Sequence, residues 1–264
     1  MRNVSVITSC FNMAPYIEKT VQSVLDQTIP ALEHIVVNDG STDDSLELLM
    51  ELEKNDPYLR VLNVTNRGQP NARNAGLISM DPRAEGVIFL DGDDWLEPNF
   101  IEETTSYMAD GAVCVFPKIR FWVQGDDVDA YMDRWYGAGR HHAGEPVFHT
   151  KPVTPTLEEL WRGPTMHPTA LFSADFIKEV GGFNGRVLGP CDWDMYIDLV
   201  ARGHEIIYCP TTYYNCIVRE DSQSHSRPSS DIFRPELWRH HWRSLSAAGL
   251  NPRTPSGKRH LEEL

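Results

Sequence analysis

The sequence lacks the features that mark several large classes of protein. Its five cysteines form no CxxC pair and no zinc-binding spacing, and their number is odd, so reduced thiols in a cytoplasmic protein are expected. No apolar run is long enough to span a bilayer, and the apolar segment 4–8 is typical of a strand rather than of a signal peptide. Basic residues are scarce, with 24 Lys and Arg against 38 Asp and Glu, which argues against a nucleic-acid-binding protein.

Two nucleotide-binding motifs are also missing. No GxGxxG follows the first predicted strand, and no GxxxxGK[ST] occurs anywhere. The sequence therefore lacks the usual motifs of dinucleotide-binding and P-loop proteins, which argues against both classes. The few basic residues are unevenly placed, because residues 219–264 hold eight Lys and Arg against six Asp and Glu. This C-terminal segment is therefore the part of the chain suited to meet anionic groups.

Strands and helices alternate regularly over the first 90 residues, which predicts parallel βαβ units and an α/β fold. The expected strands are 3–10, 32–37, 60–64 and 87–90, and the expected helices are 15–27, 45–54 and 71–79. The second half is less regular, with expected helices at 98–109, 157–161, 176–180 and 192–201 and expected strands at 112–121, 169–172, 205–208 and 213–218. Between them, residues 124–150 form a long loop, and loops of this length are usually functional or disordered.

An acidic turn follows the buried strand 87–90. Asp91, Asp93 and Asp94 crowd together with Gly92 between the first two, and in open α/β sheets ligands bind beyond the carboxyl ends of strands. Carboxylates this close raise one another's pKa, and a hard divalent cation such as Mg²⁺ or Mn²⁺ would remove that penalty. The alternative is a solvated acidic turn that caps the next helix.

Five motifs occur in order, each near the end of a predicted element. They are Thr8-Ser9-Cys10-Phe11-Asn12, Asn38-Asp39-Gly40-Ser41-Thr42-Asp43, Gly68 with Ala72-Arg73-Asn74, Asp91-Gly92-Asp93-Asp94, and Val180-Gly181-Gly182-Phe183-Asn184 with Cys191-Asp192-Trp193-Asp194. Together they resemble the family 2 inverting glycosyltransferases of the GT-A fold, over roughly residues 3–220. The resemblance implies a Rossmann-like, mixed but mostly parallel sheet flanked by helices in a single domain.

The resemblance also implies a site for a nucleotide-sugar donor, and a UDP-sugar is expected. Asp39 would accept a hydrogen bond from the uracil ring, and Asp91 would hold the ribose hydroxyls. Asp93 of the DxD motif would bind the Mn²⁺ or Mg²⁺ that bridges the diphosphate, as a Lewis acid for the leaving group. The other residues expected to bind the donor are Thr8, Asn12, Gly68, Arg73 and Gly92. Helix capping by Asp39 and a surface salt bridge of Arg73 are the structural alternatives.

Inversion at the sugar requires a general base, which the family supplies as the Asp of a Glu-Asp pair. Asp192 matches this base, with Cys191 in place of the Glu, and the start of its helix is expected to favour the ionised carboxylate. Trp193 and His167 are expected to contact the acceptor. His225 could complete the metal shell, the alternative being a flexible polar loop.

These observations predict a metal-dependent inverting glycosyltransferase of the hexosyl- or N-acetylhexosaminyl-transferase type, acting in polysaccharide biosynthesis. The expected acceptor is a carbohydrate, a lipid-linked molecule or a protein, with no nucleic acid, no transmembrane segment and peripheral membrane contact left open. Residues 1–220 would form the catalytic domain, with a donor half of about 1–110 and an acceptor half of about 111–220, and 221–264 a partly flexible extension. A nucleotidyltransferase and a non-catalytic sugar-nucleotide-binding module are the alternatives.

Overall fold

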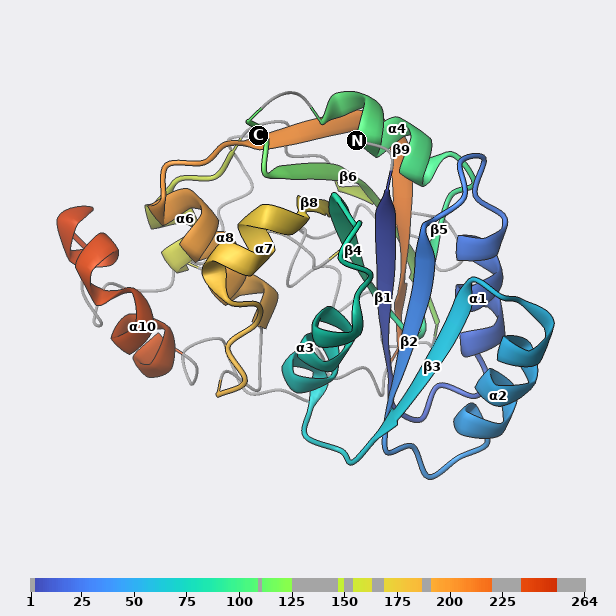
Figure 1. The fold of residues 1–264 in the computed structure, drawn as a ribbon. Coiled ribbons are helices and arrows are strands. Elements are labelled where there is room, and N and C mark those ends of the chain that lie inside the picture. The colour runs from blue at the N-terminus through green and yellow to red at the C-terminus, as the bar shows by residue number, and fades with distance from the viewer. Residues whose placement is uncertain are drawn as a thin grey trace.

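The computed structural model describes residues 3–108, 111–124, 147–149, 154–162, 169–186, 191–219 and 234–250. The first part of the chain forms the alternating units that its sequence predicts (Figure 1). The elements are β1 (Val4–Cys10), α1 (Ile17–Leu25), β2 (Glu33–Asp39), α2 (Ser45–Asn55), β3 (Leu59–Val64), α3 (Gln69–Ser79) and β4 (Gly86–Asp91). Every residue of β1 and β2 is buried, which accounts for their β-branched, apolar sequences.

The order in which strands are added to the sheet reverses at β1. Its strand order is β3-β2-β1-β4-β8-β6-β9-β5, with β7 beside β6. The chain steps outward from β1 through β2 to β3 and then returns by α3 to place β4 on the opposite side of β1. β1 pairs in parallel with both neighbours, so the carboxyl ends of β2, β1 and β4 lie side by side where the strand order reverses, a place called the crevice below. In doubly wound sheets, this is the place where ligands bind.

The second half adds shorter strands and the helices that cover them. These elements are β5 (Trp95–Leu96), α4 (Phe100–Tyr107), β6 (Cys114–Val123), β7 (Val147–His149), α6 (Leu157–Arg162), β8 (Leu171–Ser173), α7 (Ala174–Val180), α8 (Cys191–Ala201), β9 (Ile206–Val218) and α10 (Arg234–Ala247). β8 runs antiparallel to β4 and β6, whereas β6 and β9 pair in parallel, so this half of the sheet is mixed.

Two of the predicted strands are one strand. The segments expected at 205–208 and 213–218 join as β9, which stays paired with β6 throughout. The pairing shifts register at Pro117/Lys118, where Pro117 pairs with Cys209 and Lys118 with Tyr213. Residues 210–212 are thereby accommodated as an irregularity within the strand, which accounts for the gap between the two predicted strands.

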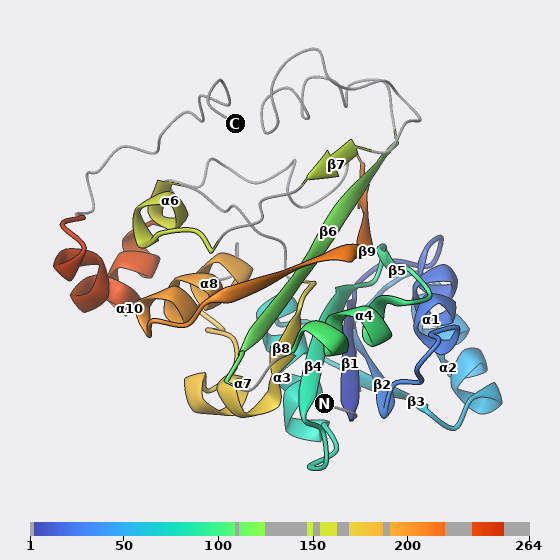
Figure 2. The same ribbon diagram turned by 90° about the horizontal axis from the view of Figure 1, so that it is seen from above.

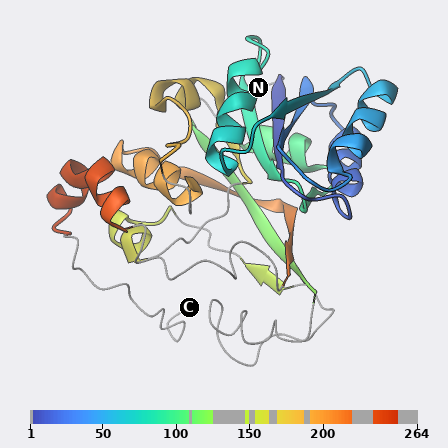
Figure 3. The same ribbon diagram turned by 90° about the horizontal axis from the view of Figure 1, so that it is seen from below.

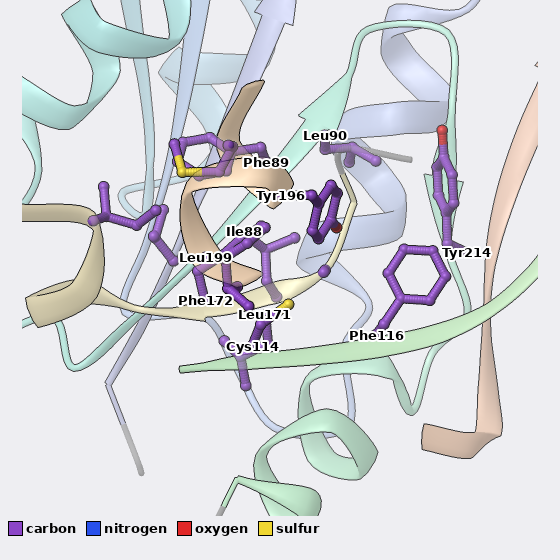
Figure 4. Packing of buried hydrophobic residues seen from close by; sticks show 14 of the residues in the cluster. Ile88, Phe89, Leu90, Cys114, Phe116, Leu171, Phe172, Tyr196, Leu199 and Tyr214 are labelled. Atoms are coloured by element: carbon purple, nitrogen blue, oxygen red, sulfur yellow. The ribbon is translucent and has the colours of Figure 1, made fainter. Parts of the chain in front are cut away.

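Much of the main core lies between the sheet and helices α7 and α8. Figure 4 shows apolar side chains of β4, β6 and β8 facing those of α8. Tyr196 of α8 packs between two rings, with its centroid 6.2 Å from that of Phe116 and 5.8 Å from that of Phe172. Tight packing of this kind fixes the position of α8 and so of the residues at its start.

Helix α10 packs against this body. In Figures 2 and 3 it lies beside α6 and α8, at the end of the molecule far from α1 and α2. Leu237 and Leu245 are fully buried and belong to the main core. Part of the predicted flexible extension is therefore an ordered helix.

All five cysteines are free and buried. Within the described part of the chain, no helix has the length and apolar character needed to cross a membrane.

Candidate active site

Asp39 ends β2 and organises the turn that precedes α3. Its Oδ1 accepts a hydrogen bond from the backbone N–H of Arg67 (2.9 Å), and its Oδ2 accepts one from the N–H of Gly68 (2.9 Å). Gly68 has φ 88°, in the left-handed region that favours glycine, and stands at the N-terminal cap of α3. The buried carboxylate thus holds two loops together at the crevice, which differs from the helix-capping alternative.

The loops that follow β1 and β2 are also joined by hydrogen bonds. The Asn12 side-chain oxygen accepts a bond from the N–H of Thr42 (2.8 Å), and the Asn12 N–H donates to the Ser41 hydroxyl (3.0 Å). Asn12 has φ 55°, a conformation that asparagine tolerates better than most residues. Its side chain is therefore engaged in shaping the rim of the crevice.

Thr8 does not line the crevice with its side chain. It is fully buried within the sheet, and its hydroxyl lies 2.8 Å from Nε2 of His34. Burial lowers the pKa of His34 to about 3, so the imidazole is neutral. The Thr8 side chain therefore packs inside the sheet, and a contact of this residue with the donor stays a prediction.

Asp91, at the end of β4, is hydrogen-bonded to residues of β1 and α3. Its Oδ1 accepts hydrogen bonds from Gln69 Nε2 (2.8 Å), Arg73 Nη2 (2.6 Å) and the Ser9 hydroxyl (3.4 Å). Gln69 and Arg73 lie four residues apart and so share one face of α3. The side chain of Asp91 keeps a quarter of its surface exposed, which leaves it reachable by a ligand.

Arg73 connects this carboxylate to the start of α8. The guanidinium is buried, and its Nη1 lies 3.1 Å from Sγ of Cys191. Burial lowers the pKa of Arg73, but Asp91, Cys191 and Asp192 raise it by more, so the group stays charged. The predicted surface alternative for Arg73 is therefore wrong.

Asn74 and the segment Gly182-Phe183 pack beside Arg73. Asn74 exchanges two hydrogen bonds with the backbone of Phe183, one donated by Nδ2 (2.7 Å) and one accepted by Oδ1 (2.8 Å). The Phe183 ring lies 5.2 Å from the guanidinium carbon of Arg73 and packs edge-on against Phe89. A Cβ at Gly182 would come within 2.6 Å of Asn74 Oδ1, so the glycine permits this close contact.

Asp192 lies in the first turn of α8, one residue beyond Cys191. Its pKa is raised by burial, an effect that Arg73 opposes and Asp91 reinforces. The prediction that the helix start would govern its ionisation is corrected, because desolvation is the larger influence. A carboxylate with a raised pKa, beside a fixed cation, is better matched to accept a proton near neutral pH.

The acidic turn after β4 separates into two halves. Gly92 approaches β1 so closely that a Cβ would lie 3.0 Å from the Ser9 carbonyl oxygen, so a larger residue would require the backbone there to shift. Asp93 pairs with Arg219, whose Nη2 lies 2.9 Å from Oδ2. The Arg219 guanidinium also stacks over the ring of Tyr16, with its carbon 4.7 Å from the ring centroid. A cation thus already neutralises Asp93 at the mouth of the crevice.

Asp94 points the other way. It is buried, its Oδ2 accepts a hydrogen bond from the Tyr214 hydroxyl, and its Oδ1 accepts one from the N–H of Ile217 (2.8 Å). Burial raises its pKa well above the ordinary value, and the nearby Asp93 and Asp91 add to the shift. Asp94 therefore ties the turn to β9, and the three carboxylates do not form one cluster.

Trp193 is a core residue. It is almost fully buried, and its indole N–H donates a hydrogen bond to the backbone carbonyl of Leu160, which joins α8 to α6. The predicted contact of Trp193 with an acceptor is corrected on this ground. His167 and His225 lie outside the described residues. Most of the loop expected at 124–150 also lies outside them, and of its described residues Val147–His149 form the strand β7.

Three features of the site were not predicted from the sequence. They are the hydrogen bond of Gln69 to Asp91, the ion pair of Arg219 with Asp93, and the stacking of Arg219 on Tyr16. Gln69 had a signal, since it lies one turn before Arg73, but the helix was expected to begin at residue 71 and begins at Gln69. The contact of Arg219 joins residues 126 positions apart, and no local pattern encodes it.

Comparison with known proteins agrees with this arrangement. The sequence profile described as "Glycosyl transferase family 2" matches residues 5–169 of this chain. The chain belongs to glycosyl transferase family 2. A chondroitin synthase of Pasteurella multocida is 28% identical over 225 residues, which is 84% of this chain and 21% of that protein. The chain thus spans about a fifth of the length of this relative.

Two solved structures share the fold of this chain. TarS of S. aureus (residues 1–349) in complex with UDP-GlcNAc superposes with a TM-score of 0.69 at 22% identity, over 95% of this chain and 68% of that one. A mannosyltransferase of Pyrobaculum calidifontis in complex with GDP-Man and Mn²⁺ gives a TM-score of 0.61 at 20% identity, over 96% and 66%. These likenesses confirm the predicted GT-A fold, a mixed α/β sheet with flanking helices.

Proposed function

We propose that this member of family 2 is a metal-dependent inverting glycosyltransferase that takes its sugar from a UDP-sugar. The observation that carries the proposal is the bridge made by Arg73. Its two terminal nitrogens contact Asp91, in the donor motif, and Cys191, next to the candidate base Asp192. Residues from the two halves of the chain therefore converge at the crevice where a reacting sugar would lie.

The residues around Asp93 fit a hard divalent cation that binds together with a nucleotide. Asp93 is a partly exposed carboxylate that already pairs with a cationic group, Arg219. Asp91 is engaged by Gln69 and Arg73, and Asp94 is turned into the core, so the protein offers few oxygen ligands here. Mg²⁺ and Mn²⁺ sites of this kind are completed by phosphate oxygens and water. When bound, the cation would supply Lewis-acid stabilisation of the departing diphosphate.

The chain's own residues account for the remaining steps. Asp39 and the turn that it holds at Arg67 and Gly68 would receive the base, and Asp91 would hold the ribose hydroxyls, because these residues lie at the carboxyl ends of β2 and β4. Arg219, which pairs with Asp93 in this structure, would also bind the diphosphate, because a guanidinium can donate hydrogen bonds to phosphate oxygens. Asp192 would take the proton from the acceptor hydroxyl as that oxygen attacks the sugar.

The identity of sugar and acceptor is proposed at the level of class. A hexose or N-acetylhexosamine as donor sugar, and a growing polysaccharide as acceptor, are supported by the name of the chondroitin synthase and by the UDP-GlcNAc complex of TarS. Cytoplasmic placement, a lipid-linked or protein acceptor and peripheral contact with a membrane stay predictions.

A screen of nucleotide-sugars by thermal shift, with and without Mn²⁺, tests the donor, and nucleotide release tests turnover. We expect UDP-sugars to raise the melting temperature more in the presence of Mn²⁺, and UDP to be released when a suitable acceptor is added. Binding with neither hydrolysis nor transfer would instead favour a non-catalytic sugar-nucleotide-binding module, for which Cys191 in place of a carboxylate is the motivating feature. The absence of any binding to nucleotide-sugars would contradict the proposal.

A further inference from the structure

A second polar cluster lies on the side of α8 away from the crevice. Asp194 and Asp192 are two residues apart on this helix, which places their side chains about 200° apart around its axis. Oδ1 of Asp194 lies 3.0 Å from Nδ1 of His240 and 2.8 Å from Nε2 of His241, both in α10. Asp194 and His241 are buried, whereas the side chain of His240 is 49% exposed.

A break in α10 makes this convergence feasible. Consecutive side chains of a regular helix diverge by about 100° and cannot reach one atom together. His241 has φ −108° and ψ 15°, which are not helical values, and two helical segments meet there. The centroids of the two imidazole rings consequently lie 4.4 Å apart, and the ring planes are inclined at 49°. Each ring places one nitrogen near the same carboxylate oxygen, Oδ1 of Asp194.

We propose that Asp194, His240 and His241 bind a divalent transition-metal ion of the Zn²⁺ type. One possible ligand atom from each residue lies within 4.8 Å of the other two. Among the described residues, no other group of three His, Cys, Asp or Glu side chains brings its ligand atoms this close together. A zinc ion with ligands at about 2.0–2.2 Å holds them roughly 3.3 Å apart, so small side-chain movements would complete the site. Two imidazoles and one carboxylate are a ligand set that zinc accepts, and the exposed His240 leaves room for water as the fourth ligand.

The chemistry separates this site from the one at Asp93. Imidazole nitrogen favours Zn²⁺, Co²⁺ or Ni²⁺, whereas an oxygen-only site with diphosphate favours Mg²⁺ or Mn²⁺. Histidine binds a metal through a nitrogen that carries no proton, so metal uptake at this cluster is expected to weaken as the pH falls.

The proposed ion would join two helices that are distant in sequence. α10 is otherwise held to the body by apolar contacts such as those of Leu237 and Leu245, and α8 carries the candidate base at its start. A bond from each helix to one metal would stabilise their packing and so position α8. This positioning role adds to the proposed glycosyl transfer but does not depend on it.

Metal binding to the full chain tests the proposal without an activity assay. The protein, first treated with chelator, is titrated with Co²⁺ while its visible absorption is recorded, and bound Zn²⁺ is counted after dialysis. We expect the wild type to show the d–d bands of Co²⁺ in a four-coordinate site with a nitrogen ligand, and His240→Ala to lose them together with one bound Zn²⁺ per chain. Zn²⁺ should raise the melting temperature of the wild type by several degrees and leave that of His240→Ala nearly unchanged.

Two control variants separate this site from other causes. Asp198→Asn removes a carboxylate one turn from Asp194 that pairs with Arg202, and it should keep the Co²⁺ signal. Asp93→Ala should also keep it, because Asp93 belongs to the proposed donor site. His240 is half exposed, so its replacement is expected to leave the fold intact, and circular dichroism checks this. Equal metal content and equal Co²⁺ spectra in the wild type and His240→Ala, or no metal uptake by the wild type, would overturn the proposal and leave a hydrogen-bonded contact between helices.

Discussion

Replacing Asp192 by Asn should abolish most transfer while leaving donor binding nearly unchanged. The substitution keeps the size of the side chain and removes its ability to take a proton. General-base catalysis contributes roughly 10²–10⁴-fold to rate, so the loss corresponds to about 3–5 kcal/mol in activation free energy. The donor side should be spared, because Arg73 would remain paired with Asp91 at 2.6 Å.

Asp194→Asn on the same helix provides the matched control. Asp194 faces His240 and His241 instead of Arg73, so its loss should lower stability by about 1–3 kcal/mol and affect transfer much less. The assay is UDP release in the presence of acceptor, compared with UDP affinity by calorimetry and with the melting temperature of each variant. Normal transfer by Asp192→Asn, or an equal loss of transfer in both variants, would refute the assignment of the base.

Three other changes test the site. Arg73 lowers the pKa of Asp192, so in Arg73→Met the acidic limb of the pH profile of the residual kcat/KM should shift to higher pH than in the wild type. An unchanged pH profile would count against an electrostatic effect of Arg73 on Asp192. Asp39→Ala should weaken UDP binding by about 1–3 kcal/mol in calorimetry, because the turn at Arg67 and Gly68 loses two hydrogen bonds, whereas wild-type affinity would limit Asp39 to a structural role. Asp94→Asn should lower the melting temperature yet preserve the response of UDP binding to Mn²⁺, since Asp94 faces Tyr214 and Ile217, and loss of that response would return it to the metal site.

The donor half could be predicted because its signals are local. Apolar runs of strand length, each followed by a polar turn and an amphipathic segment, specify βαβ units without distant information. The ends of β2 and β4 therefore placed Asp39 and Asp91 correctly at the edge of the sheet. What the pattern could not give was the direction of each side chain, as Asp94 shows: it turns inward because of Tyr214 and Ile217, about 120 residues later.

The second half was harder for the same reason. No helix was predicted over α10, which falls in the extension expected to be partly flexible; its sequence is mostly polar, and few of its apolar residues, Leu237 and Leu245 among them, enter the core. Trp193 was assigned to the acceptor, but it is buried and its indole N–H donates a hydrogen bond to Leu160 of α6. Burial of Asp192 likewise depends on Arg73 and the packing of α8, so its raised pKa was not visible in the sequence.

The most direct test of the account is a calorimetric titration of UDP into the wild type and Asp93→Ala, each with and without Mn²⁺. The account predicts that Mn²⁺ strengthens UDP binding to the wild type and has no effect on Asp93→Ala, whose fold should be intact because Asp93 lies at the mouth of the crevice. Equal UDP affinity of the wild type with and without Mn²⁺ would contradict a metal-dependent donor site at the end of β4.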